Sequence, residues 1–240
     1  MLAGGAVAAA AGAAIGALGF RFKIGGVYFA ILTIAFAEFT RILFDHWLWV
    51  GGSGGFFLPV SGRSGIDLLG LRGPPAMFYY VWLAFTIGVL VLCRALLSSR
   101  LGYYWLAIRE DQEAAQALGI NTFRWKMLAV AISAAMTSVA GVFFAFYYNN
   151  LFPEQVFNIS RSIEIILGPV IGGVGTLFGP ILGAAVLTLL SDGITEALAA
   201  LGWEVPGIKQ VFYGVVLLVV IMFLPHGIWP AVARKMGIRP

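Results

Sequence analysis

Charged residues are scarce in this sequence: they make up 11% of its 240 residues, whereas hydrophobic residues make up 60%. A soluble domain carries about 25% charged residues, so this chain cannot cover itself with a polar surface. The single cysteine, Cys93, excludes a disulfide framework and a cysteine-based metal site. The two histidines, His46 and His226, lie near the ends of apolar stretches, where we expect interfacial polar roles.

Sequence motifs for chemistry are missing as well. The chain has no nucleophile motif, no Gly-Lys-Ser/Thr phosphate-binding loop and no metal-ligand spacing. We therefore expect no catalytic residues, no cofactor and no ATP hydrolysis in this chain, so that a partner must supply energy for any pumping. The net charge of +4 is explained by basic segments that flank membrane spans, and nucleic-acid binding is not expected.

The sequence does contain several long stretches without Asp, Glu, Lys or Arg. Each is about as long as the ~17–25 residues that cross a bilayer. A further span, about 27–50, is interrupted by Glu38, Arg41 and Asp45. The sequence therefore predicts an all-α, polytopic helical membrane protein with six to seven transmembrane elements in one domain, 1–240. The uncharged stretches are 1–20, 73–93, 127–153, 165–191 and 210–233.

Glycine and proline divide these stretches into elements. Residues 51–75 are too rich in both to form a regular helix. The apolar region 161–200 is too long for one span and is broken at 172–180, so we expect a short or re-entrant element followed by a full span. The expected helices are 2–20, 27–48, 77–97, 127–148, 162–174, 177–198 and 208–224.

Two features inside the spans are candidates for the pathway or for gating. Glu38 and Arg41 share a helix face, and a charge deep in lipid costs ~2.5 kcal/mol or more, so they must face a partner, a cavity or each other. The pair is either structural or lines a pathway, and the same alternatives hold for Glu164.

The second feature is the glycine-rich segment with Gly172, Gly173, Gly175, Gly179 and Pro180. Glycines at 175, 179 and 183 would lie on one face if the segment is helical, and they would permit close helix contact. Pro180 favours a break before it. The segment is a packed hairpin, a hinge, or both.

Basic residues predict the orientation. Three basic stretches lie on one side if 161–224 crosses three times: the one around Arg21, the segment 98–126 and the C-terminal tail. This side is then the cytoplasm, and loops 51–75 and 149–160 lie outside, although Arg63 and Arg72 then lie outside too. If 162–174 only dips into the membrane, the tail is placed outside instead.

The charged segment 98–126 lies between two apolar stretches. Its residues 109–121 favour a helix that ends at Gly119-Ile-Asn121. In the same segment an apolar stripe is formed by Ala107, Ala114, Ala115 and Leu118. Such a cytoplasmic helix is either a solvent-exposed connector or a protruding element that binds in a groove of a partner protein.

Several stretches, in this order, resemble the LivM-type permease of high-affinity branched-chain amino-acid ABC importers, and the resemblance covers nearly the whole chain. They are Val27-Tyr-Phe-Ala-Ile-Leu-Thr-Ile-Ala-Phe-Ala-Glu38, Gly51-Gly-Ser-Gly-Gly55, Ala107-Ile-Arg-Glu-Asp-Gln-Glu-Ala-Ala-Gln-Ala-Leu-Gly-Ile-Asn121, Ser162-Ile-Glu-Ile165, Gly172-Gly-Val-Gly-Thr-Leu-Phe-Gly-Pro-Ile-Leu-Gly-Ala184 and Leu224-Pro-His-Gly227.

The resemblance implies a subunit in a bacterial inner membrane that pairs with a LivH-type sister permease, two ATPases that bind ATP and Mg, and an extracytoplasmic binding protein for a small amino acid. It also implies that the ATPase-coupling segment contains Arg109, Glu110, Glu113, Ala114, Ala115 and Gly119. LivM-type chains usually begin with further spans, so an N-terminal truncation is expected. Two alternatives remain: a urea or short-amide permease on the same framework, and an ion-coupled secondary transporter that uses Glu38 and Glu164.

Overall fold

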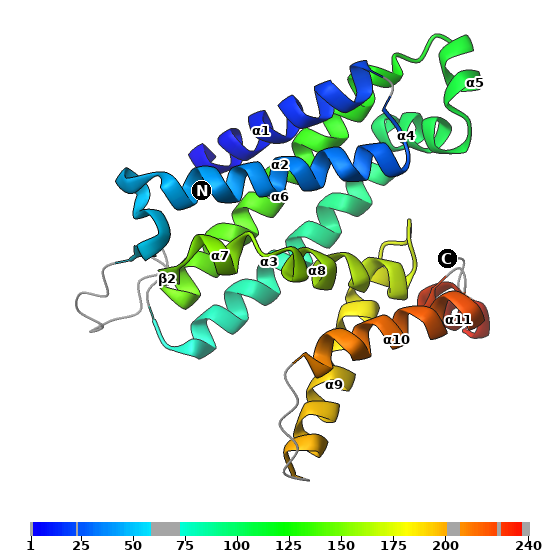
Figure 1. Ribbon diagram of the computed structural model, residues 1–240. Helices are drawn as coiled ribbons and strands as arrows, with labels where there is room; N and C mark the ends of the chain where they lie inside the picture. Colours follow the sequence, from blue (N-terminus) through cyan, green and yellow to red (C-terminus); the bar gives the residue numbers. More distant parts are fainter. Residues whose placement is uncertain (1, 23, 59–72, 201–206, 225–226, 237–240) are drawn as a thin grey trace. The chain divides into compact units, whose positions relative to one another are not determined.

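A computed structural model describes residues 2–22, 24–58, 73–200, 207–224 and 227–236, and Figure 1 shows its course. The chain divides into two compact units, Met1–Phe157 and Asn158–Pro240. Each unit is built from helices, which satisfy their backbone hydrogen bonds internally, as a membrane interior requires.

The first unit contains four long helices and the charged connector. Its helices are α1 (Leu2–Arg21), α2 (Val27–His46), α3 (Pro75–Leu97), α4 (Arg100–Glu110), α5 (Gln112–Ala117), α6 (Thr122–Tyr148) and α7 (Pro153–Val156). Two 3-10 turns, η1 (Leu48–Val50) and η2 (Gly52–Gly54), follow α2, and η2 lies in the predicted glycine-rich loop. Residues 59–72 of that loop, with Arg63 and Arg72, lie outside the described residues. Two short strands, β1 (Phe56–Phe57) and β2 (Asn150–Leu151), complete the unit.

Glycine brings α1 and α6 into close contact along much of their length. A Cβ atom added at Gly12 would lie 2.9 Å from the Cβ of Ala134, and one at Gly16 would lie 3.4 Å from the Sδ of Met127. Small residues allow this approach, which gains dispersion contacts where lipid offers no hydrophobic driving force. The glycine-rich composition of the first span therefore forms a packing face.

The first unit has two chemically different ends (Figure 1). At one end α4 and α5 lie where α1 ends and α6 begins, and the Nζ of Lys126 lies 5.6 Å from the ring centre of Phe20. At the other end β1 and β2 pair antiparallel, with Phe56 opposite Leu151. The charged segment is therefore separated within this unit from the described parts of the two predicted outer loops, 51–58 and 149–157.

The second unit is a tightly packed helical cluster. It contains α8 (Ile159–Gly172), α9 (Gly179–Ala200), α10 (Ile208–Phe223) and α11 (Ile228–Lys235). Its core is formed by Leu167, Ile171, Leu187 and Val220, and Ile171 is fully buried. These residues come from α8, α9 and α10, so the three helices share one core.

Helix lengths agree with the predicted membrane elements. Within the described ranges, five helices are long and apolar enough to cross a membrane: α1, α2, α3, α6 and α9. The 14 residues of α8 extend about 21 Å at 1.5 Å per residue, less than the ~30 Å hydrocarbon core. The 16-residue α10 is also shorter than these five. Within the described ranges each of the seven predicted elements coincides with a helix, and α8 is the short one.

Candidate functional site

The charged segment is two helices rather than one, and Asp111 divides them. The expectation of a single helix over 109–121 is wrong at this residue, whose φ of −152° and ψ of 113° end α4. The Oδ1 of Asp111 accepts hydrogen bonds from the backbone N–H of Glu113 at 2.8 Å and of Ala114 at 3.0 Å. Aspartate is a favoured N-cap, so the residue whose backbone ends α4 also begins α5 through its side chain.

Helix α5 has an outward face and an inward face. The outward face, which we define as Glu113, Ala114, Ala117 and Leu118, is exposed, and Leu118 is 82% exposed. Ala115 points inward and is only 2% exposed. The predicted apolar stripe therefore separates, since Ala115 packs inside the unit whereas Ala114 and Leu118 remain on the surface.

Gly119 ends α5 in the way that the sequence predicts. Its φ is +84°, a left-handed conformation that favours glycine. The backbone N–H of Ile120 donates to the carbonyl of Ala115 at 3.0 Å, and that of Gly119 donates to Gln116 at 2.9 Å. This pair of bonds is a Schellman motif, which fixes the direction in which the chain leaves α5 toward α6.

The inward side of α5 is tied to the first turns of α6. The Nε2 of Gln116 donates to the Oγ1 of Thr122 at 2.8 Å, and the Nζ of Lys126 donates to the Oε1 of Gln112. Thr122 is buried. Two side-chain hydrogen bonds and the short Schellman turn therefore join α5 to the start of α6.

Helix α4 is tied to the same part of α6 by aromatic residues. The indole N–H of Trp105 donates to the carbonyl of Trp125 at 2.9 Å. The ring of Tyr104 stacks on Trp125 with centroids 4.8 Å apart. Because α4 and α5 both contact the start of α6, the connector is a structured platform.

Arg109 and Glu110 lie on the exposed surface of α4. Their side chains are 64% and 70% exposed, and the Nε of Arg109 lies 4.0 Å from the Oε1 of Glu110. An exposed pair at this distance contributes little to stability. Both charges are therefore accessible to a partner.

Glu38 and Arg41 pair with each other, one of the arrangements expected from their spacing. The Nε of Arg41 donates to Oε1 of Glu38 at 3.0 Å and to Oε2 at 3.1 Å, and Nη2 donates to Oε1 at 2.5 Å. The side chain of Glu38 is 53% exposed and that of Arg41 is 29% exposed. The pair lies in the middle of α2, away from α4 and α5.

The glycine-rich segment is a tight hairpin between α8 and α9. An added Cβ at Gly172 would collide with the carbonyl oxygen of Gly179, and one at Gly183 would collide with that of Gly168. Pro180 lies in the first turn of α9, where its missing N–H costs no helical hydrogen bond. The packed-hairpin alternative describes this geometry, and a hinge role stays a prediction.

Gly175 does not share the glycine face of α9. It lies in the turn between α8 and α9 with a φ of +80°, as does Gly173 with a φ of +128°. The predicted helical face of Gly175, Gly179 and Gly183 is therefore wrong at Gly175, which is not in a helix. Gly168 of α8, which the spacing argument left out, lies opposite this face, where a Cβ atom added at Gly183 would meet its carbonyl oxygen.

Residues outside the predicted set also shape these sites. Asp111, Gln112 and Gln116 position α5, and Thr176 accepts a hydrogen bond from the backbone N–H of Gly179 at 3.1 Å. An Asp that precedes a helix-favouring run is a readable N-cap signal, whereas the glutamine contacts depend on tertiary structure. His226 lies outside the described residues, and among the described ones no group of three His, Cys, Asp or Glu side chains could hold a metal ion.

The helices define a multi-pass helical membrane protein with a charged platform at one end of its first unit. A family model described as the branched-chain amino acid transport system / permease component matches residues 1–221. The chain therefore belongs to this family of membrane permeases. It is not itself an enzyme by this membership, since the family is a transport component.

Individual relatives agree with this membership. The chain is 28% identical to the high-affinity branched-chain amino acid transport system permease protein LivM of Escherichia coli K12, over 98% of this chain and 58% of that protein. It is 32% identical to LivH of the same organism over 62% of this chain and 46% of that protein. It is 23% identical to a probable LivM of Methanocaldococcus jannaschii over 87% of this chain and 61% of that protein.

The chain therefore spans less than two thirds of the length of these curated relatives. No solved structure matches it.

Proposed function

We propose that the chain is a membrane permease subunit of an ATP-driven importer for branched-chain or related hydrophobic amino acids. Its family and its similarity to LivM over 98% of its length support the transport class and the substrate class. The observation that carries the coupling role is the outward face of α5, which stays exposed while the inward side of the same helix is bonded to α6. A helix in this arrangement can receive a partner and pass on its movement.

In the proposed mechanism, an ATPase subunit receives the outward face of α5 in a surface groove. Glu113 offers a carboxylate to a basic residue of the groove, and Leu118 offers an exposed apolar side chain. Closure of the ATPases around ATP moves α5, and α6 follows because Gln112 and Gln116 hold it. The helices then change the side from which the substrate is accessible.

The assembly that this mechanism needs contains four kinds of subunit. They are this chain, a LivH-type sister permease, two ATPases that bind ATP and Mg, and an extracytoplasmic binding protein that delivers the amino acid. The chain itself uses no cofactor. It lies in the bacterial inner membrane with α4, α5 and the C-terminal tail in the cytoplasm, an orientation that its basic segments support.

A charge reversal on the outward face of α5 tests the coupling role. Glu113→Lys in the assembled complex is expected to abolish transport-coupled ATPase activity while the permease still assembles, because a lysine would repel the basic partner. The matched control is Glu154→Lys, which makes the same charge change on exposed α7 at the other end of the unit. Equal transport by Glu113→Lys and the wild type would contradict the assignment.

Uptake by the reconstituted complex tests the substrate class. Labelled leucine should accumulate in an ATP-dependent manner, and excess urea should not compete with it. Uptake driven by a proton or sodium gradient without ATP would instead identify an ion-coupled transporter.

A further inference from the structure

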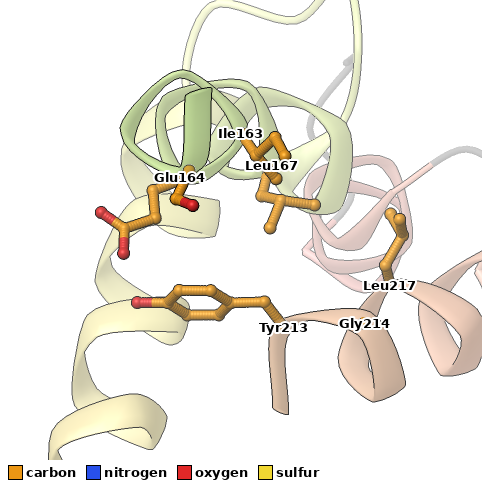
Figure 2. A pocket seen from close by; sticks show the side chains of 7 residues that line it. Ile163, Glu164, Leu167, Tyr213, Gly214 and Leu217 are labelled. Atoms are coloured by element: carbon orange, nitrogen blue, oxygen red, sulfur yellow. The ribbon is translucent and has the colours of Figure 1, made fainter. Parts of the chain in front are cut away.

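A pocket in the second unit combines one carboxylate with an apolar lining (Figure 2). It has a volume of about 180 Å³ and lies between α8 and α10. Its lining residues are Ser160, Ile163, Glu164, Leu167, Tyr213, Gly214 and Leu217.

The polar and apolar groups of the pocket are separated. In Figure 2 the carboxylate of Glu164 and the hydroxyl of Tyr213 extend toward the same side, and Leu217 lies away from them. The hydroxyl of Tyr213 donates to the Oγ of Ser191 at 3.4 Å, which leaves the lone pairs of its oxygen to accept. The polar side is therefore dominated by hydrogen-bond acceptors.

The charge of the lining selects the ligand's polar group. Glu164 is the only charged residue among these seven described lining residues. Arg161 holds Glu164 from outside the lining, with its Nη1 3.0 Å from Oε2. An ammonium group, which donates three hydrogen bonds and carries a positive charge, fits this set of acceptors better than an anion or a neutral amide does.

The volume selects the rest of the ligand. A cavity of about 150 Å³ accommodates benzene, so this pocket accepts a branched aliphatic chain of a few carbons. The side chains of Ile163, Leu167 and Leu217 supply apolar contacts for it. Gly214 contributes space, because a Cβ atom added there would meet nothing within 4 Å.

We propose that this pocket binds the aliphatic ammonium part of the transported amino acid, with Glu164 as the ammonium acceptor and Gly214 as the residue that sets the available volume. The proposal rests on the proposed import function and deepens it by naming a substrate contact. It also favours an aliphatic amino acid over urea, which has neither an ammonium group nor an apolar chain.

The test is leucine uptake by the complete complex in vesicles of phosphatidylcholine and phosphatidylglycerol, which contain no primary ammonium. Glu164→Gln removes the charge, and Gly214→Leu fills the pocket. Glu164→Gln is expected to raise the KM for leucine about tenfold or more, because it removes a charge-assisted hydrogen bond. Gly214→Leu is expected to raise it as well, because the added side chain occupies the space of the ligand's aliphatic chain. For Gly214→Leu, the KM for alanine should rise less than the KM for leucine.

Two control variants separate binding from structure. Gly193→Leu places the same side chain at another helical glycine with open space around it, in α9, and should keep the wild-type KM. Arg161→Gln breaks the same ion pair as Glu164→Gln but retains the carboxylate, so its KM should rise far less.

Each other outcome contradicts a defined statement. Wild-type uptake with an unchanged KM in Glu164→Gln and Gly214→Leu overturns the pocket and leaves the import function standing. An equal rise in KM in Arg161→Gln and Glu164→Gln would show that Glu164 acts only as the structural partner of Arg161. This result would also overturn the proposed pocket. A defect that appears only after phosphatidylethanolamine is added identifies a lipid ammonium as the ligand instead, and no leucine uptake by the wild type contradicts the import function itself.

Discussion

At the residue scale, glycine has different roles at positions that look alike in sequence. Gly183 and Gly193 both lie in α9. A Cβ at Gly183 would lie 2.6 Å from the backbone nitrogen of Gly172, whereas a Cβ at Gly193 would meet nothing within 4 Å. The first glycine permits a backbone contact between helices, and the second is not required by packing inside this chain.

This difference predicts unequal effects of the same substitution. Gly183→Ala should force α8 and α9 apart and lower the free energy of unfolding by about 1–3 kcal/mol, the usual cost of overpacking. Gly193→Ala should leave it nearly unchanged. The thermal unfolding midpoint of the purified protein in detergent, followed by tryptophan fluorescence, measures both, and equal midpoints for the two variants would refute the packing role.

At the element scale, α5 depends on its caps because it has only six residues. An isolated helix of this length is unstable in water. Asp111 satisfies two backbone N–H groups at its start, and the Schellman motif at Gly119 satisfies carbonyls at its end. The shape of the outward face is therefore determined by residues that lie just outside it.

Removal of the first cap should loosen α5. Asp111→Ala is expected to cost about 1 kcal/mol and to speed amide hydrogen exchange in residues 112–117, with loss of ATPase coupling. Asp111→Asn retains a capping oxygen and should keep most of the protection. If exchange in Asp111→Ala matches the wild type, the cap does not hold this helix.

The sequence predicts the long elements well and the connector less well. Uncharged stretches locate the spans, because charge is expensive in lipid. The same criterion starts α6 five residues late: the helix begins at Thr122 beneath its Asn121 cap, and its first turns contain Arg124 and Lys126. Charged residues therefore predict where a helix leaves the membrane. The end of the helix itself is determined by its capping hydrogen bonds.

The candidate pocket could not be predicted at all. Glu164 was visible as a carboxylate near the end of a span, but its neighbours Tyr213 and Gly214 lie about fifty residues away in an apolar run. Nothing in the spacing of one helix specifies which face of a distant helix it will meet. Only the packing of α8 against α10 brings the carboxylate of Glu164 close to the phenol of Tyr213 and to the open space at Gly214.

At the scale of the whole molecule, the proposed topology can be tested by chemical labelling. In a Cys93→Ser background, Glu113→Cys should react with a membrane-impermeant thiol reagent only from the cytoplasmic side, and Gln155→Cys only from the opposite side. Both positions are exposed and lie at opposite ends of the first unit. Labelling of both from the same side would refute the orientation.

The same assay determines how α8 enters the membrane. Met236→Cys, in the exposed residue after α11, should label together with Glu113→Cys if the region 161–224 crosses three times. Labelling together with Gln155→Cys would show that α8, at 14 residues, enters and leaves on one side. Either result is independent of transport activity.

The continuous α6 helix has a mechanical consequence. Its 27 residues extend about 40 Å, with α5 bonded at the start and β2 immediately after the end. Midway, α6 bears on α1 where Ala134 meets Gly12. Further contacts with α1 lie on both sides of this point, between Gly16 and Met127 and between Gly4 and Ser138. A push on the Lys126 end of α6 would therefore shift α1 and α6 together, as one rigid pair.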